Sequence, residues 1–309
     1  MTTRRLGRTD LYIEPLIFGC NVLGWTLEES AAFTVLDAYV DAGFTAVDTA
    51  DSYGRGKSET ILGNWMKARG NRDKVLVFTK VGSDVGQGHR DLSAKWIAEE
   101  VDASLKRLQT DRIDLYQSHW PDPNTPQEET LEAFDRLVKA GKVRWIGSSN
   151  QDENLLGEAL AISKSKAIAR YQTVQNEFNL YDRSSFEGAV QNLCVKEEVS
   201  GIGYFSLARG FLSGKYRRIT DVDKSARGKA AVDKYLNPKG ERILGALDAV
   251  SKRNGTTPAA VAIAWIGAQP GVGGPIASAT SAEQLKSLTD GARLKLSADD
   301  LKQLTDAGR

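Results

Sequence analysis

The sequence contains few of the residues that build metal sites or disulfide frameworks. Among its 309 residues are two cysteines, Cys20 and Cys194, and two histidines, His89 and His119. Two distant cysteines without a CxxC spacing are typical of a reduced, cytoplasmic protein. Two histidines cannot supply a zinc or iron site made of several imidazoles, and no carboxylates stand at ligand spacing, so we expect no metal.

The chain also lacks an excess of charge of either sign and any long apolar run. The 41 Lys and Arg residues balance 40 Asp and Glu residues, which leaves a net charge of +1. This balance gives no electrostatic footprint for nucleic acid or for an anionic membrane. No apolar run approaches the roughly 18–20 residues of a membrane helix, and no signal-peptide segment stands at the N-terminus. We therefore expect a soluble protein that acts on a small molecule, with its oligomeric state open.

What the sequence does contain is an alternation of short β-branched runs with helix-length amphipathic segments. We expect strands at residues 16–19, 46–48, 75–80, 113–119, 143–148, 173–176, 202–205 and 275–277. We expect helices at residues 28–42, 59–69, 94–108, 126–140, 153–164, 186–197, 242–253, 258–268, 282–288 and 298–304. About eight βα units without a linker, and without a GxGxxG after any strand, favour one (β/α)8 TIM barrel over a doubly wound sheet.

Further elements surround this barrel in the sequence. An N-terminal hairpin precedes it and extra helices follow it at the C-terminal end, so we expect a single domain over residues 1–309. A polar stretch at residues 213–239 interrupts the alternation, and a loop of this length is usually functional or mobile. Side chains that cap helices are expected at Thr26, where Glu29 would close a capping box, and at Ser58 and Thr125.

The carboxyl ends of three successive expected strands carry groups suited to chemistry, where the active site of such a barrel lies. They are Asp48, Tyr53 shortly beyond it, Lys80 and His119. Each has an ordinary alternative, namely a carboxylate that caps a loop, a packed ring, a solvated lysine and a structural histidine. Together the four have no packing reason to be there, so we interpret them as one site.

These four groups meet the needs of carbonyl reduction, which requires a hydride source and an acid that protonates the developing alkoxide. A phenol with a pKa of about 10 is a poor acid near neutral pH. An ammonium such as Lys80 beside Tyr53 would lower that pKa, and Asp48 would hold the ammonium charged and in position. His119 could orient the carbonyl oxygen or share the proton. We therefore predict that Tyr53 is the proton donor.

Longer stretches of the sequence resemble the aldo-keto reductase family. They are GFTAVDTADSYG at residues 43–54, VFTKVG, QSHWPD, GKVRWIGSSN, QNEFNL, GYFSLARGFLSGKY and IASATSAEQL, and they span almost the whole chain in the family's order. The resemblance is nearest to the branch of potassium-channel β-subunit-like bacterial aldo-keto reductases. It implies the catalytic tetrad Asp48, Tyr53, Lys80 and His119, and reduction of an aldehyde or ketone by NADPH, or less often NADH.

The same resemblance implies contacts to a cofactor across the barrel mouth. Ser149, Asn150 and Gln175 match positions that bond the nicotinamide carboxamide, and Tyr204 matches an aromatic residue that stacks on the ring. Lys215 matches a lysine that touches the phosphates, and residues 213–239 look like a loop that closes over the cofactor. The full implied set is Cys20, Asn21, Ser149, Asn150, Gln175, Tyr204, Phe205, Ser206, Leu207, Arg209, Lys215, Arg227, Ser278, Thr280 and Gln284.

The choice between NADPH and NADH depends on bases near the 2′-phosphate. Many relatives have Lys or Arg in the segment that matches residues 277–284, which here reads ASATSAEQ and contains Glu283. The asparagine expected to contact adenine is Leu288. We expect NADPH to bind more tightly than NADH, but by a smaller margin than in relatives with a basic residue in that segment. The preference would depend on Lys215, Arg209 or Arg227.

Two tryptophans, Trp25 and Trp120, are the expected walls of the substrate pocket, although core packing is the ordinary alternative for any tryptophan. An apolar, aromatic pocket suits aldehydes and ketones, without naming one. Three classes of function compete: a reductase, a cofactor-binding regulatory subunit with little turnover, and an unrelated barrel hydrolase or isomerase. The complete tetrad favours the reductase over the regulatory subunit, and the lack of a metal cluster weighs against the third class.

Overall fold

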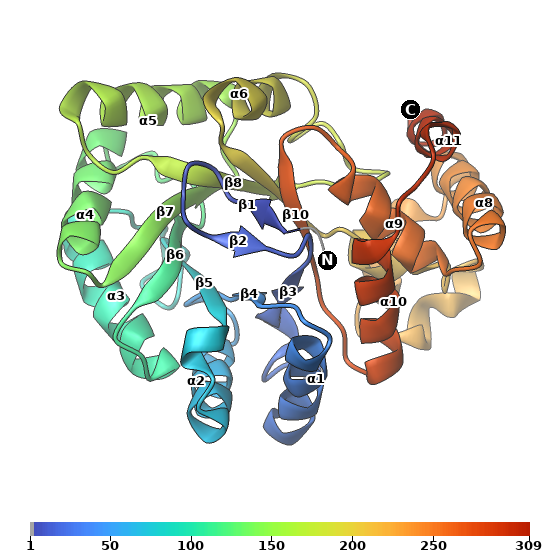
Figure 1. Cartoon of the computed structure of the whole chain (residues 1–309), viewed down its shortest axis with the longest axis horizontal. Coiled ribbons are helices and arrows are strands. Elements are labelled where there is room, and N and C mark those ends of the chain that lie inside the picture. Colours follow the sequence, from blue (N-terminus) through green and yellow to red (C-terminus); the bar gives the residue numbers. More distant parts are fainter. Residues whose placement is uncertain (1–2) are drawn as a thin grey trace.

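The computed structural model describes residues 3–309, and its centre is a closed barrel of eight parallel strands (Figure 1). The strands are β3 (Ile17–Gly19), β4 (Ala46–Asp48), β5 (Leu76–Val81), β6 (Ile113–Ser118), β7 (Val143–Ser149), β8 (Tyr171–Glu177), β9 (Ser200–Tyr204) and β10 (Val272–Ala277). They lie side by side in chain order, and β10 closes the ring on β3. The prediction of a (β/α)8 barrel is confirmed.

Helices surround the barrel, and each strand is followed by one before the next strand begins. The surrounding helices are α1 (Glu29–Asp41), α2 (Lys57–Arg69), α3 (Ala94–Leu108), α4 (Gln127–Lys139), α5 (Glu153–Lys166), α6 (Ala189–Glu197), α9 (Pro258–Gly267) and α10 (Ala282–Arg293). The further helices are α7 (Gly228–Tyr235), α8 (Pro238–Arg253) and α11 (Ala298–Ala307), with short 3-10 segments η1 (Cys20–Val22), η2 (Arg72–Lys74), η3 (Ala208–Ser213) and η4 (Ile219–Lys224). In Figure 1, α8 and α11 lie together at one side of the barrel. None of the helices in residues 3–309 is long and apolar enough to cross a membrane.

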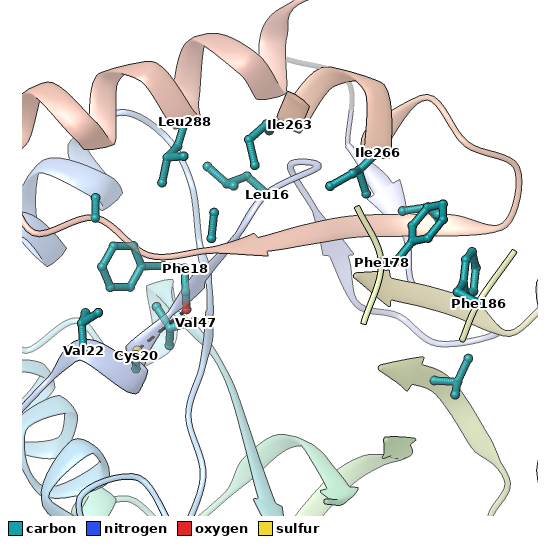
Figure 2. Close-up of a cluster of buried hydrophobic side chains, with 14 of the residues drawn as sticks. Leu16, Phe18, Cys20, Val22, Val47, Phe178, Phe186, Ile263, Ile266 and Leu288 are labelled. Carbon is teal, nitrogen blue, oxygen red and sulfur yellow. Dashed lines mark hydrogen bonds between the residues drawn. The ribbon is translucent and has the colours of Figure 1, made fainter. Parts of the chain in front are cut away.

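Side chains along each strand alternate between the barrel interior and the surrounding helices. In β5, Phe78 belongs to the interior cluster, whereas Val77 belongs to the layer between strands and helices. Figure 2 shows part of that outer layer, where Phe18 and Val47 on the strands lie near Leu288 of α10. Both faces of the strands are buried, and apolar residues predominate in a strand such as β5, which reads LVFTKV.

An N-terminal hairpin, β1 (Arg4–Arg5) and β2 (Tyr12–Ile13), closes one end of the barrel (Figure 1). Its Leu6, Leu11 and Ile13 are buried in the interior cluster. At the hairpin turn, Gly7 has a φ of +54°, and a Cβ there would lie 2.5 Å from the Gln172 carbonyl oxygen. This close approach seats the turn on the amino end of β8, so the strands' carboxyl ends are the open end of the barrel.

The stretch at residues 213–239 is not the simple loop that the sequence predicts, since it contains η4 and α7. The difference has a tertiary cause: Ala231, Val232 and Tyr235 of α7 are buried, and the ring of Tyr235 packs 5.6 Å from that of Phe211 in η3. Eight residues are too few to form a stable helix alone, so this packing stabilises α7.

The three expected capping side chains are also wrong. Helix α1 begins after Glu28 without a side-chain cap, so Thr26 does not serve as one. Thr125 instead donates to Asp122, at 2.6 Å, and Pro126 is the capping position of α4. Ser58 lies inside α2, where its hydroxyl donates to the Cys20 carbonyl at 2.8 Å. The hydroxyls of Thr125 and Ser58 therefore have partners outside the expected helix ends.

Candidate active site

The four residues of the expected tetrad meet at the open end of the barrel. Asp48 ends β4, Lys80 lies on β5, Tyr53 follows β4 in a turn, and His119 comes directly after β6. The Lys80 ammonium donates to Asp48 Oδ1 at 2.5 Å, to the Thr49 carbonyl at 2.8 Å and to the Tyr53 hydroxyl at 3.4 Å. All three ammonium protons therefore have acceptors, one of which is the phenol.

The pair of Asp48 and Lys80 is buried, with 1% and 0% of each residue exposed. Gln117 and Gln175 donate to the second oxygen of Asp48, at 3.2 Å and 3.0 Å. The carboxylate is thus satisfied on both oxygens, as a buried charge requires. Burial alone would lower the pKa of Lys80, but Asp48 and Tyr53 raise it above its ordinary value. Lys80 is therefore a fixed cation at neutral pH.

Tyr53 is held in the protonated form by its surroundings. Burial raises its pKa above that of an ordinary phenol, and Asp48 acts in the same direction, while Lys80 opposes both. Lys80 lowers the pKa of Tyr53 as the sequence predicts, but burial outweighs it, so the net shift is upward. The residue still carries the proton that a donor needs at neutral pH.

His119 is neutral at neutral pH. Burial lowers its pKa well below the ordinary range, and the charges of Lys80 and Arg90 act in the same direction. Its Nδ1 lies 2.9 Å from the Ser83 hydroxyl and 3.4 Å from that of Ser52. When Ser83 donates to Nδ1, the ring proton sits on Nε2, which can then donate to a substrate oxygen.

The residues expected to hold nicotinamide form one hydrogen-bonded network with the tetrad. Tyr204 donates from its hydroxyl to Asn150 Oδ1 at 2.8 Å, and Asn150 Nδ2 donates to the His119 carbonyl at 2.8 Å. The Ser149 hydroxyl donates to the carbonyl of Gln175 at 2.7 Å. The structure brings these residues together, and Gln175 connects them to Asp48 as described above.

Three expected phosphate ligands, Arg209, Lys215 and Arg227, have no carboxylate within 4.0 Å in residues 3–309. Arg209 lies in η3 with its guanidinium 4.5 Å from the ring centre of Phe205, and Arg227 lies 4.9 Å from that of Trp25. All three are only partly exposed. Cations without an acidic partner are suited to bind an anion.

The expected adenosine end lies where β10 meets β3. The Ser278 hydroxyl is 2.8 Å from Asn21 Oδ1, and Thr280 donates from its backbone to Gln284 Oε1 at 3.0 Å. Cys20 is fully buried, and burial raises the pKa of its thiol, so its side chain is an uncharged part of the core. The remaining expected contacts, Ser206 and Leu207, follow Phe205 between β9 and η3; the hydroxyl of Ser206 donates to the Gly203 carbonyl at 3.0 Å.

Both expected substrate walls lie at the mouth rather than in the core. The ring of Trp120 is stacked on His119 with centres 6.1 Å apart, and the Arg90 guanidinium lies 4.7 Å from the Trp120 ring. Trp25 is 52% exposed. Core packing therefore does not explain either residue.

Among residues 3–309, no three His, Cys, Asp or Glu side chains are grouped as metal ligands.

Sequence reasoning missed Gln117, Ser52 and Ser83, which contact Asp48 or His119. A signal was present for each of them. Gln117 lies two residues before His119 and so shares its side of the strand, while Ser52 adjoins Tyr53 and Ser83 follows Lys80 by three residues. Polar residues at the strand ends and in the segments just beyond them would have indicated these three side chains.

Comparisons with known proteins give similarity over nearly the whole chain. The model of the Aldo/keto reductase family matches residues 15–309. The chain is 35% identical to the aldo-keto reductase YhdN of Bacillus subtilis, over 90% of this chain and 83% of the relative. It is 29% identical to the aldo-keto reductase yakc [NADP(+)] of Schizosaccharomyces pombe, over 99% and 91%. It is 32% identical to a probable voltage-gated potassium channel subunit beta of Oryza sativa subsp. japonica, over 92% and 89%.

Proposed function

Because the chain belongs to the aldo/keto reductase family, whose members are oxidoreductases with nicotinamide cofactors, we propose that it reduces an aldehyde or ketone to an alcohol with Tyr53 as the proton donor. The observation that carries this proposal is the contact of the Tyr53 hydroxyl with the buried Lys80–Asp48 pair at the open end of the barrel. We propose a single barrel domain over residues 1–309. Both cysteines are free and buried, which supports the cytoplasm as its location.

The residues at the barrel mouth fit a dinucleotide cofactor. The unpaired cations Arg209, Lys215 and Arg227 suit its phosphates, and the amide and hydroxyl groups around Asn150 suit a carboxamide. When bound, the nicotinamide supplies the hydride. We propose that NADPH is preferred to NADH, and the relative named for NADP(+) supports this choice. Residues 213–239 would move to admit the cofactor, since Arg227 lies on Trp25 across the mouth.

The protein's own residues then orient the carbonyl oxygen of the substrate and supply the proton that it receives. The neutral Nε2–H of His119 donates to the carbonyl oxygen and orients it. As negative charge develops on that oxygen, the O–H bond of Tyr53 breaks and a new O–H bond forms on the product. The Lys80 ammonium stabilises the phenolate that remains, and Asp48 keeps the ammonium in place. Trp25 and Trp120 would exclude water from the reacting atoms.

Titration of the purified protein with NADPH and with NADH, followed by a panel of aldehydes and ketones, tests this proposal. We expect quenching of tryptophan fluorescence by NADPH at lower concentrations than by NADH, and oxidation of NADPH that depends on the carbonyl compound. Failure of both cofactors to bind would overturn the proposal. Tight binding without turnover on any carbonyl would favour a cofactor-binding regulatory subunit, the alternative to which the rice relative points.

A further inference from the structure

A layer of buried polar side chains lies behind the turn that carries Tyr53, between α2, α3 and the outer face of β5. Glu59 of α2 is fully buried and accepts hydrogen bonds from the Thr79 hydroxyl and from Arg107 Nε, both at 2.6 Å. The same guanidinium donates to Glu100 and, at 3.0 Å, to Ser104. Both glutamates of the layer therefore share Arg107.

Asp51 belongs to this layer but has no partner in it. Its side chain comes from the turn after β4 and the residue is 2% exposed. Neither of its carboxylate oxygens has a side-chain hydrogen-bond partner within residues 3–309, and the one nearby donor is the backbone amide of the adjacent Ser52. The Tyr116 hydroxyl, on the outer face of β6, is likewise buried without a partner. An unpaired buried carboxylate is costly when ionised.

The charges around Asp51 also oppose its ionisation. Glu59 faces it from α2, Glu100 and Arg107 face it from α3, and the phenol of Tyr116 faces it from β6. Arg107 already pairs with Glu59 and Glu100, so no positive charge in this layer is left to pair with Asp51. Burial is the largest cause that raises the pKa of Asp51, and Glu59 and Glu100 raise it further, while the backbone amide of Ser52 and the charge of Arg107 oppose them.

Asp51 and Tyr53 share one tight turn. The Tyr53 amide donates to the Ala50 carbonyl at 3.2 Å, and the Asp51 amide donates to the Lys80 carbonyl at 3.3 Å. The Ser58 amide in turn donates to the Tyr53 carbonyl at 3.2 Å. A displacement of the Asp51 side chain from the buried layer would therefore move the backbone that holds the Tyr53 phenol near Lys80.

We propose that Asp51, buried behind the turn without a side-chain partner, is a positioning residue for Tyr53 that acts only as a neutral carboxylic acid, so that its ionisation releases the turn that carries the phenol. This inference rests on the proposed role of Tyr53. Its test is therefore made first by stability, in a Tyr53→Phe background where neither turnover nor the ionisation of the phenol contributes.

The first experiment compares the pH dependence of Tm in Tyr53→Phe with that in Asp51→Asn/Tyr53→Phe. In the unfolded chain Asp51 has a pKa of about 3.9, and its folded pKa is higher. The aspartate protein therefore loses stability relative to the asparagine protein as pH rises from about 4 to the folded pKa, and the difference is constant above it. We expect Asp51→Asn to raise Tm by about 2 °C for each unit of pKa elevation.

Asp84 provides a matched control at the same end of the barrel, because its surroundings lower its pKa, whereas those of Asp51 raise the pKa of that residue. The Gly86 and Gly88 amides donate to its exposed carboxylate at 2.8 Å and 3.0 Å and lower its pKa. Stability from Asp84 is present above about pH 3.9 and is lost as pH falls through the folded pKa. Asp84→Asn should lower Tm at neutral pH, whereas Asp51→Asn raises it. Equal Tm curves with and without Asp51→Asn would mean that Asp51 is ionised and hydrated, and would overturn the inference.

The second experiment observes the proton and the function directly. The infrared difference spectrum between wild type and Asp51→Asn at neutral pH should contain the C=O stretch of a protonated carboxylic acid, and that band should disappear as the pH rises through the pKa of Asp51. Over the same pH range kcat should fall in wild type, and in Asp51→Asn the fall should be displaced to higher pH. If the band of the protonated acid is present but wild type and Asp51→Asn have identical pH profiles of kcat, Asp51 is a neutral acid without a positioning role, and the proposal is overturned.

Discussion

Single residues at the barrel mouth differ in how burial changes their protonation. Burial is the largest influence on Lys80, Tyr53 and His119, yet only Lys80 has a carboxylate partner that reverses it. The outcome at neutral pH is an ammonium, a protonated phenol and a neutral imidazole. These are the forms that a proton donor, its electrostatic support and a neutral hydrogen-bond donor require.

Removal of the phenolic proton tests the role of Tyr53. Tyr53→Phe keeps the ring and its edge contact with His119, so we expect the Kd for NADPH to stay within about twofold while kcat falls about 100-fold or more. Fluorescence titration and steady-state kinetics on several carbonyls measure the two quantities. Near-normal turnover on those carbonyls would remove Tyr53 from its proposed role.

Removal of the ammonium tests the buried pair. Lys80→Met leaves Asp48 as an uncompensated buried charge, so we expect the free energy of unfolding to fall by about 3–5 kcal/mol. The double variant Asp48→Asn/Lys80→Met should be more stable than Lys80→Met alone, as measured by urea denaturation. Loss of Lys80 should also raise the pKa of Tyr53 further, because the ammonium is the group that lowers it.

That pKa has a kinetic consequence for the same variant. The proton donor must be protonated, so activity is present below the pKa of Tyr53 and is lost as pH rises through it. In Lys80→Met we expect lower activity near neutral pH and an alkaline limb displaced to higher pH, because the charge that lowers the pKa of Tyr53 is gone. A pH profile of Lys80→Met identical to that of wild type would contradict the electrostatic argument.

At the scale of elements, the strand ends and the segment after β9 contribute different groups to the barrel mouth. The strand ends supply the tetrad, whereas the segment after β9 supplies η3, η4 and α7 with the unpaired cations. Helix α7 is anchored at its far end, where the Tyr235 hydroxyl donates to Asp182 at 2.7 Å and Lys234 donates to the same carboxylate at 3.0 Å. This segment therefore reaches from the β8 side of the mouth to Trp25.

Lys215 tests whether that segment distinguishes the two cofactors. A charge-assisted contact is worth about 1.5–3 kcal/mol, so Lys215→Met should raise the Kd for NADPH by about tenfold or more if Lys215 holds phosphate. A loss confined to NADPH would assign Lys215 to the 2′-phosphate, and an equal loss for NADH would assign it to the pyrophosphate. Lys229→Met is the control, since Lys229 is exposed on α7 and pairs with Asp233. No change for either cofactor would mean that Lys215 does not touch it.

The whole molecule separates stability and chemistry between the two ends of the barrel. The hairpin seals the amino ends of the strands with Leu11, which is 1% exposed. Leu11→Ala should lower the free energy of unfolding by about 2–5 kcal/mol, while the Kd for NADPH stays unchanged. Tyr12, its neighbour, is 57% exposed, so Tyr12→Ala should change stability by less than about 0.5 kcal/mol. A weakened cofactor affinity in Leu11→Ala would show that the two ends are coupled.

Local sequence was sufficient for most elements of the fold. The expected helix at residues 94–108 and the expected strand at 46–48 agree with α3 and β4 at both ends, because their apolar periodicity and boundaries are local. Tetrad positions followed from the same pattern, since parallel strands bring their carboxyl ends to one rim. The helix in residues 213–239 did not follow, because its stability depends on Phe211 and the core rather than on its own eight residues.

The sequence by itself determined which groups reach the mouth of the barrel, because strand alternation and chain order are properties of neighbouring residues. Only the tertiary structure decided what those groups are bonded to and which protons they keep. Gln175 donates to Asp48 across 127 residues of chain, and Asp51 is enclosed by Glu59, Glu100 and Tyr116 without a side-chain hydrogen-bond partner in the described residues 3–309. Burial and charge in three dimensions set both outcomes, and in Tyr53 burial outweighs the lowering of the pKa by Lys80 that the sequence predicted.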